Sequence, residues 1–357
     1  MHRFALVLLA ACGSGEATRA PPVVAVVATD ATTEADPLAH DPRRWFAGDV
    51  HMHVAPPDDP EDVTMGVGEI ADAALRAGLE FVVLTPHLWS SRWGGEFRRT
   101  WQAFAEEAAV IAKPTMIPGV EWSDRDGHFT VAGVDVAALR GPFLEAADRA
   151  GAFISANHPF AVPTNIPGVR VSHMDISYRP WSARRAGFTA IDGAEVWNVP
   201  LGLANILSRP GGRTGEERAW TELDRVVREE QRPVTAVGGT DNHKTHVMAT
   251  TWVLAVDATA TAILEAIVGG ATCVGGPEAG SFRARGDDAR WVRIGERVVG
   301  RTITLAWNGT ARLFIDEVDR GELANGFVHE TGGALHTYRI VIGPSRCGFI
   351  YANLPPA

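Results

Sequence analysis

Short apolar runs and longer amphipathic segments alternate along the chain between Trp45 and about Gly280. The short runs have the length of buried strands, and the longer segments repeat apolar residues at the helical period. We expect strands at 45–50, 81–85, 115–121, 129–134, 152–156, 194–197, 234–237 and 251–256. We expect helices at 70–77, 104–111, 144–150, 216–230 and 261–268. This alternation predicts an α/β fold with a parallel sheet, most simply closed as a barrel.

The helical pattern ends near Gly280, and short strands follow. Thr302–Trp307 and Ala311–Ile315 are apolar runs separated by Asn308 and Gly309. Asn-Gly between two such runs is a strong signal for a β-hairpin. We therefore expect a hairpin within a small antiparallel β domain at 281–357, after an α/β domain at 42–280.

The N-terminus has a separate character. Arg3 precedes an apolar run from Phe4 to Ala11, and small residues precede Cys12. This stretch is too short to span a bilayer, which needs about 20 residues, and it resembles a bacterial lipoprotein signal. The resemblance implies a signal peptide at 1–11, a lipid anchor on Cys12, a flexible linker at 12–41 and an exported, membrane-anchored protein. The alternative is an unstructured apolar end.

Composition narrows the partners and the redox chemistry. The 357 residues are 46% hydrophobic and carry a formal net charge of -10, which repels the phosphate backbone of nucleic acids. We expect a small-molecule ester substrate, no nucleic acid, and membrane contact only through the lipid anchor. Without Cys12, Cys273 and Cys347 remain, either as a disulfide or as two separate buried thiols.

Metal-binding residue types gather where predicted strands end. Asp49, His51 and His53 alternate along the first strand, so their side chains point to one side. Two imidazoles on one side are a ready pair of metal ligands. Asp49 is either an acceptor that orients an imidazole or a polar strand residue. Asp241 and His243 follow the apolar strand at 234–237 in the same way.

Taken in order, these motifs resemble the polymerase and histidinol phosphatase (PHP) family of metallohydrolases, most closely its carbaryl-hydrolase-like branch. The resemblance implies a distorted (β/α)7 barrel with two or three divalent metal ions at the carboxyl ends of its strands. Ligands of nitrogen and oxygen without thiolates suit zinc, manganese or iron. The matching stretches are 48–53, 84–87, 118–121, 127–129, 157–160, 194–198 and 239–243.

The resemblance also implies a grouping of the ligands. The three groups are His51, His53, Glu121 and Asp241; His128 and His158, with Glu121 as the bridge; and His87 with His243. The family has a further ligand for the third site in a stretch that this chain lacks, and Asp58 and Asp59 are the nearest substitutes. Pro86 stands where the family commonly has Asp.

Several polar residues are less clearly assigned. Glu195 and Asn198 match a family stretch and act either at the site or in the structure. Lys244, Arg184 and Arg185 are candidate cations for a phosphate-binding pocket. The remaining histidines outside the patterns are expected on the surface or in the core: His40, His173, His329 and His336.

The motifs predict a metal-dependent hydrolase, with phosphoesters as the first choice of substrate. A hydroxide bridging two metal ions would attack phosphorus or a carbonyl carbon. Glu121, Asp241 and His243 are the candidate catalytic residues. Two alternatives are a carbamate or carboxylic ester hydrolase with the same metal centre, and a non-catalytic lipoprotein that binds metal or another ligand.

Overall fold

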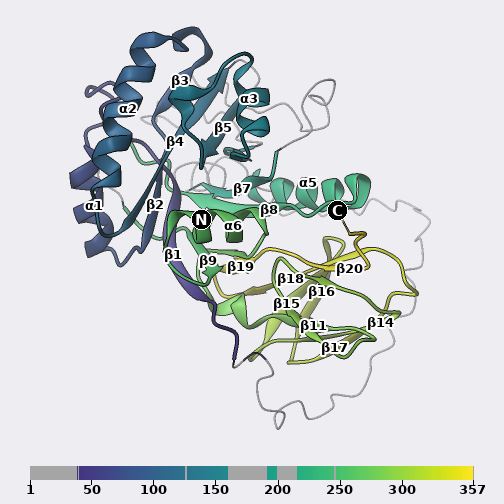
Figure 1. Cartoon of the computed structure of the whole chain (residues 1–357). Helices are drawn as coiled ribbons and strands as arrows, with labels where there is room; N and C mark the ends of the chain where they lie inside the picture. Colours follow the sequence, from purple (N-terminus) through teal and green to yellow (C-terminus); the bar gives the residue numbers. More distant parts are fainter. Residues whose placement is uncertain are drawn as a thin grey trace, which may run out of the picture.

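The computed structural model describes residues 38, 40–124, 127–159, 191–198, 215–244 and 247–356. Within these residues the chain forms a large curled sheet, helices packed against its α/β part, and a second, smaller sheet (Figure 1). The predicted signal peptide with Cys12 and nearly all of the predicted linker lie outside the described residues, as do His173, Arg184 and Arg185. None of the described helices is both long enough and apolar enough to cross a membrane.

All the expected strands and helices of the α/β part are present. The strands are β1 (Arg44–Met52), β2 (Phe81–Leu84), β3 (His87–Trp89), β4 (Thr115–Asp124), β5 (Gly127–Ala132), β6 (Phe153–Ala156), β7 (Gly193–Asn198), β8 (Thr235–Gly239), β9 (Thr251–Ala255) and β10 (Thr272–Val274). The helices are α1 (Val67–Arg76), α2 (Gly95–Ala109), α3 (Phe143–Arg149), α5 (Gly215–Glu230) and α6 (Ala260–Val268). Helix α2 begins well before its expected start. The apolar pattern missed its first turns because they are mostly polar.

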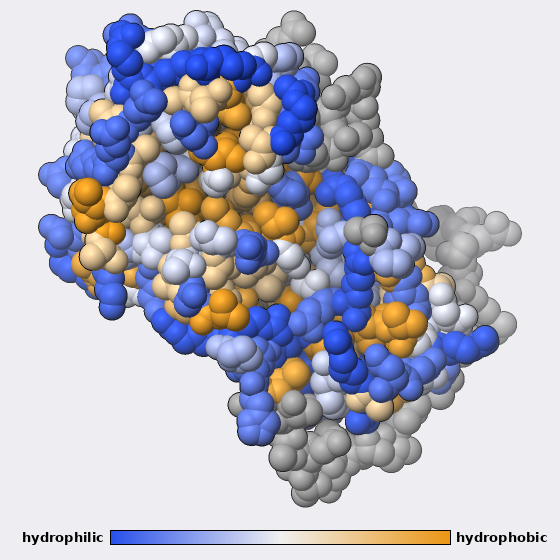
Figure 2. All heavy atoms as spheres, viewed as in Figure 1, coloured by the Kyte–Doolittle hydropathy of each residue, from blue (hydrophilic) through white to orange (hydrophobic). Residues whose placement is uncertain are grey.

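Helix α1 shows how the apolar pattern fixes an element. Its buried residues Val67, Ile70, Ala71 and Ala74 lie on one side, as the helical period requires. The side chain of Glu69 accepts the backbone N–H of Gly66 at 3.0 Å and caps the first turn. The buried side joins the main hydrophobic core, which packs against the sheet. On the face seen in Figure 2, hydrophobic residues gather near the middle of the α/β part and hydrophilic residues border them.

The expected parallel sheet is only partly correct. Strand order is β9-β1-β2-β4-β5-β6-β7-β8. Strands β1, β2 and β4 are parallel, and so are β6, β7 and β8, but β5 runs antiparallel to both β4 and β6. A (β/α)7 barrel is not confirmed, because the described part of the chain contains five α-helices rather than seven.

The curl of the sheet brings its first and last parallel strands together. The backbone N–H of Asp241 donates to the carbonyl of His51 at 2.9 Å, and that of His53 donates to the carbonyl of Asn242 at 3.2 Å. These two bonds join the end of β1 to the residues that follow β8. Residues far apart in the sequence therefore meet at one end of the sheet, which is where the candidate ligands lie.

The β-rich part contains two sheets. The smaller one has the order β12-β11-β14-β17 and is antiparallel. The other strands continue the large sheet, because β19 pairs with β10. The predicted boundary at residue 281 stays a prediction. The strands are β11 (Arg283–Arg285), β12 (Trp291–Arg293), β13 (Arg297–Val298), β14 (Thr302–Ala306), β15 (Ala311–Ile315), β16 (Val318–Leu323), β17 (Phe327–Glu330), β18 (His336–Ile342), β19 (Ser345–Cys347) and β20 (Ile350–Ala352).

The hairpin predicted around Asn308 and Gly309 is wrong. Both strands exist, but β14 pairs with β11 and β17, whereas β15 pairs with β16 and β18. The turn therefore carries the chain from one sheet to the other. Apolar residues of both strands fill a shared core, among them Leu305 and Leu313, together with Trp307 directly after β14. Strands from two packed sheets bury alternate residues in a shared core, so they show the same alternating pattern as the strands of a hairpin.

The two remaining cysteines form a disulfide. Cys273 of β10 and Cys347 of β19 are directly opposite each other in an antiparallel pair, and their sulfurs are bonded. The bridge links the α/β part to the β-rich part, which decides between the two alternatives left open by the sequence.

Candidate metal centre

The structure brings all eight predicted metal ligands into one connected cluster. Six of them come from strand ends or strand interiors of the α/β part, and the others follow β8 directly. Each imidazole lies within 3.8 Å of a carboxylate oxygen of Glu121 or Asp241. The residues are His51, His53, His87, Glu121, His128, His158, Asp241 and His243.

Glu121 lies at the centre of the cluster. Its Oε1 is 3.3 Å from Nε2 of His51, 3.3 Å from Nε2 of His158 and 3.1 Å from Nδ1 of His128. Its Oε2 is 3.5 Å from Nε2 of His87 and 3.7 Å from Nε2 of His53. The two oxygens of one buried carboxylate thus face two different sets of nitrogens.

Three groups within the cluster have the geometry to hold a metal ion. In each group the ligand atoms lie within 4.8 Å of one another. The groups are His53, His87 and His243; His51, Glu121 and His158; and His51, His53 and Asp241. The predicted partnership of His87 with His243 is therefore present, with His53 as its third member. His128 contacts Glu121 but belongs to none of these groups, so its role as a ligand stays a prediction.

Buried carboxylates outside the centre hold three of the imidazoles. An ionised carboxylate only accepts hydrogen bonds, so the Nδ1 atom that faces it carries the proton. His51 Nδ1 donates to Oε1 of Glu195 at 3.2 Å, and His53 Nδ1 donates to Oδ2 of Asp58 at 3.1 Å. His87 Nδ1 donates to the other oxygen of Asp58 at 3.1 Å. When a metal ion binds, each Nε2 would present its lone pair to the centre, which is how outer carboxylates orient metal-binding histidines.

Asp58 has a different part from the one suggested by the sequence. The sequence suggested Asp58 as a substitute ligand for the third metal site. In the structure its two oxygens accept hydrogen bonds from His53 and His87. The backbone N–H of His87 also donates to Asp58 at 2.8 Å. Asp59, the other substitute, accepts the backbone N–H of Glu61 at 3.0 Å. Sequence order identified Asp58 as relevant, but only the fold shows which atoms it contacts.

Glu195 and Asn198, whose roles the sequence left open, also form hydrogen bonds with residues of the cluster. Glu195 accepts the backbone N–H of His158 at 2.6 Å, and Nδ2 of Asn198 donates to both Glu195 at 3.1 Å and Asp241 at 3.3 Å. Sequence reasoning missed Asn157, whose Nδ2 donates to Glu121 at 2.9 Å. Its position directly before His158 was the available signal.

Asp49 contacts backbone N–H groups and threonine hydroxyls rather than an imidazole. Its Oδ1 accepts the N–H groups of His51 and Thr240, both at 3.1 Å. Asp49 is therefore the polar strand residue of the two alternatives, and it fastens the end of β1 to the end of β8. Burial raises the pKa of Asp49 to about 6, although the hydrogen bond that the hydroxyl of Thr240 donates to it acts to lower the pKa.

The backbone at the centre is strained and closely packed. His158 and Asp241 have positive φ values of 29° and 50°, a region that non-glycine residues seldom adopt. Gly239 is required by close approach, because a Cβ there would lie 2.4 Å from Cβ of His51 and 2.2 Å from Oε1 of Glu195. Such strain persists only where the surrounding contacts fix the chain, and it is common at functional sites.

Charge and burial set the protonation of the cluster. Burial lowers the pKa of His53, but hydrogen bonds to Asp241 and Asp58 raise it to about 9. Burial raises the pKa of Glu121, yet the neighbouring His128 and His51 hold it well below its ordinary value. Protons and metal ions thus compete for the same imidazole nitrogens, so metal binding would release protons.

The donor set fits divalent metal ions. All its members offer imidazole nitrogen or carboxylate oxygen, and His51, His53 and Glu121 are each only 1% exposed. Nδ1 of His158 is buried without a hydrogen-bond partner among the described residues. Buried polar atoms are normally paired, so this unpaired nitrogen is consistent with a ligand that is not part of the protein.

No family model matches this chain, and no curated protein matches it. Among solved structures it is similar to a two-domain protein of Bacteroides vulgatus ATCC 8482 that contains a predicted PHP-like metal-dependent phosphoesterase. The two share 16% sequence identity, the match covers 87% of this chain and 95% of that one, and the TM-score is 0.43.

Proposed function

We propose that this protein is a PHP-type, metal-dependent hydrolase that cleaves phosphoesters. The observation that carries the proposal is the position of Glu121, whose two oxygens face two sets of imidazoles. A carboxylate has an oxygen for each of two metal ions, whereas an imidazole has one inward nitrogen to offer. Capture of a single ion does not need a shared carboxylate, so the arrangement favours catalysis over storage.

Divalent ions held by this cluster would supply Lewis acidity, which acidifies water and polarises the ester under attack. The protein's own groups hold that site in place. Asp241 is fixed between His53 Nε2, 3.1 Å from its Oδ1, and Asn198 Nδ2, 3.3 Å from its Oδ2. Because these contacts use both oxygens, the carboxylate keeps one orientation as a substrate enters.

His243 is the candidate proton acceptor. Its Nδ1–H donates to the backbone carbonyl of Asp241 at 3.0 Å, which leaves Nε2 without a proton. Its side chain is 22% exposed, more than those of His51 and His53. His243 therefore stands where the buried cluster meets solvent, and its Nε2 is placed either to bind an ion or to take a proton from attacking water.

The full chain, reconstituted separately with zinc, manganese and iron(II), tests the proposal. We expect metal-dependent release of p-nitrophenol from p-nitrophenyl phosphate or bis-p-nitrophenyl phosphate, and a loss of at least about a hundredfold in Asp241→Ala. Turnover of an aryl carbamate alone would favour the carbamate hydrolase. Bound ions with no turnover of any of the three substrates would favour the non-catalytic binding protein.

We also propose that the protein is exported and anchored through a lipid on Cys12. The Leu9-Ala10-Ala11-Cys12-Gly13 stretch supports this, and a Cys273–Cys347 disulfide suits an oxidising compartment. In cells, Cys12→Ala should move the protein from the membrane fraction to the soluble fraction. Retention of this variant in the membrane fraction would contradict the anchor.

A further inference from the structure

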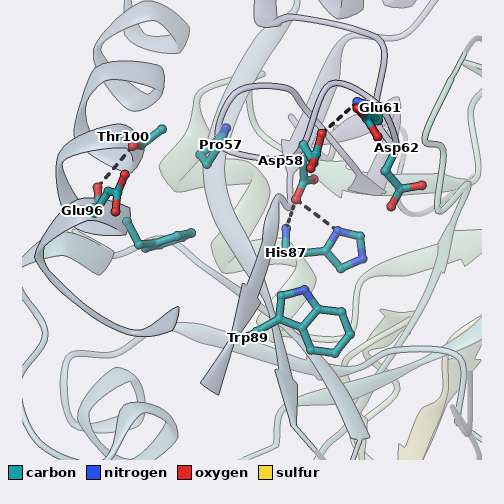
Figure 3. A pocket seen from close by; sticks show the side chains of 10 residues that line it. Pro57, Asp58, Glu61, Asp62, His87, Trp89, Glu96 and Thr100 are labelled. Atoms are coloured by element: carbon teal, nitrogen blue, oxygen red, sulfur yellow. Dashed lines mark hydrogen bonds and ion pairs between the residues drawn. The ribbon is translucent and has the colours of Figure 1, made fainter. Parts of the chain in front are cut away.

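A pocket of about 780 Å³ adjoins the candidate metal centre. His87 belongs to both, because it lines the pocket and is a member of a metal-binding group with His53 and His243. Figure 3 shows His87 and Trp89 beside each other on β3, with Glu96 and Thr100 on α2 across the pocket. A substrate whose reacting group lies at the metals would extend its other part into this pocket.

The charge of the pocket is negative. Its lining contains five carboxylates, and none of the described lining residues is Lys or Arg. Asp58 is occupied by His53 and His87, whereas the other four are exposed: Asp59, Glu61, Asp62 and Glu96. A pocket that gathers carboxylates attracts cations and repels a second phosphate group. This part of the site therefore disfavours polyphosphates and phosphorylated leaving groups.

An aromatic surface lies in the same pocket. Trp89 is 41% exposed, which is unusual for so large an apolar side chain. Its ring stacks on that of His87, with centroids 5.7 Å apart and planes 3° apart. Phe97 of α2 also lines the pocket. Indole is the ring that best attracts an alkylammonium ion, and nearby carboxylates add to the attraction.

We propose that this pocket binds the alkylammonium group of a phosphoester whose phosphoryl group lies at the metal centre. The inference rests on the proposed function and adds a substrate class to it. The metal ions receive the anionic phosphoryl group, while Trp89 and the carboxylates receive the cation at the other end. The substrate class is thus zwitterionic phosphoesters with a quaternary ammonium group.

The probe is p-nitrophenyl phosphorylcholine, compared with p-nitrophenyl 3,3-dimethylbutyl phosphate, in which an uncharged tert-butyl group replaces the trimethylammonium group. Water supplies the oxygen that bonds to phosphorus, the P–O bond to p-nitrophenol breaks, and phosphocholine and p-nitrophenol are the products. The two probes have the same shape and differ in one positive charge. With the metal-loaded full chain we expect kcat/KM to favour the choline ester by about tenfold, and salt to reduce this ratio.

Variants identify the pocket as the origin of the preference. Two variants should each bring the ratio of the two kcat/KM values close to one. They are Trp89→Leu and the triple variant Glu61→Gln, Asp62→Asn and Glu96→Gln. Asp62→Asn and Glu96→Gln alone should lower the ratio in part. The matched control is Glu106→Gln, which removes the same charge from an exposed position of α2 outside the pocket and should keep the ratio.

Two outcomes would overturn the inference without touching the proposed function. The first is turnover of bis-p-nitrophenyl phosphate together with equal kcat/KM for the choline ester and its isostere. The second is a choline preference that survives in both the Trp89→Leu variant and the triple variant. Absence of turnover of both p-nitrophenyl phosphate and bis-p-nitrophenyl phosphate with every metal would instead count against the proposed function.

Discussion

The described part of the chain contains two clusters of histidine and carboxylate that differ in geometry. In the candidate metal centre, imidazoles from several strands face the shared carboxylate of Glu121. In the β-rich part, the rings of His329 and His336 have centroids 4.7 Å apart. His336 Nδ1 lies 2.8 Å from Oδ2 of Asp316, and His329 Nδ1 lies 2.9 Å from the hydroxyl of Tyr338. Each of these imidazoles has its own partner.

The difference shows that nearness of histidines does not make a metal site. At the metal centre, outer carboxylates hold Nδ1 of His51 and His53, and the opposite nitrogens converge on common oxygens. In the second cluster the contacts are separate pairs. Within the described residues, all three groups with metal-binding geometry lie in the first cluster. Convergence on a shared carboxylate is therefore the feature to test.

Removal of that shared carboxylate should have the largest effect. In Glu121→Gln an amide NH2 group replaces one carboxylate oxygen, so the residue can no longer join two ions as a carboxylate. We expect loss of at least one bound ion per chain and a fall in hydrolysis of at least about a hundredfold. Elemental analysis after dialysis and p-nitrophenol release measure the two effects. The control His336→Ala should keep both, and unchanged metal content in Glu121→Gln would remove the distinction between the clusters.

The close packing around the first cluster can be broken without changing a ligand. Gly239→Ala places a Cβ against Cβ of His51 and Oε1 of Glu195, and overpacking of this kind costs about 3 kcal/mol. Urea unfolding of the metal-free protein measures the loss. The matched control is Gly68→Ala in α1, where an added Cβ has no heavy atom within 4 Å, and it should stabilise the protein by up to about 1 kcal/mol. Equal effects of the two changes would contradict the packing described here.

Asp58→Asn should loosen the first cluster while leaving every inward nitrogen in place. An amide at this position cannot accept from His53 and His87 with both of its polar atoms, so one imidazole loses its support. Loss of such outer partners lowers metal affinity by about 10–100-fold. Competition with a fluorescent chelator measures the change. Asp316→Asn makes the same replacement beside His336 and should leave the affinity as it is, since that carboxylate supports no metal ligand.

The smallest effect concerns a half-buried carboxylate with no histidine partner. Burial raises the pKa of Asp192 to about 6, although the N–H of Ile154, which donates to it at 2.7 Å, acts to lower the pKa. The pKa is higher in the folded state than in the unfolded state, so the folded state binds more protons between about pH 4 and 6. Stability should therefore fall by about 2 kcal/mol as the pH rises through this window.

Asp192→Asn keeps an oxygen acceptor for Ile154 and should remove this part of the pH dependence. Urea unfolding of metal-free wild type and variant at pH 4.5 and 7 gives the comparison. The variant should gain stability relative to wild type at pH 7 and show little difference at the lower pH. A difference that is the same at both values would show that Asp192 does not titrate in this window.

Local pattern predicted the elements better than it predicted their pairing. Every apolar run that predicted a strand in the α/β part does form one, because residues buried on a sheet must be apolar. The turn at Asn308 and Gly309 was also recognisable, but its strands pair in different sheets. A turn signal describes about four residues, whereas strand pairing is decided by which distant strands offer free edges.

The sequence by itself determined which residue types stand at the strand ends, and the ordered motifs were enough to identify all eight candidate ligands. Tertiary structure decided how they divide among the groups, and which carboxylates orient them. His51 and Glu195 are 144 positions apart, and His53 and Asp241 are 188 apart. Contacts over such separations depend on the curl of the sheet, because it alone brings the carboxyl end of β1 against the end of β8.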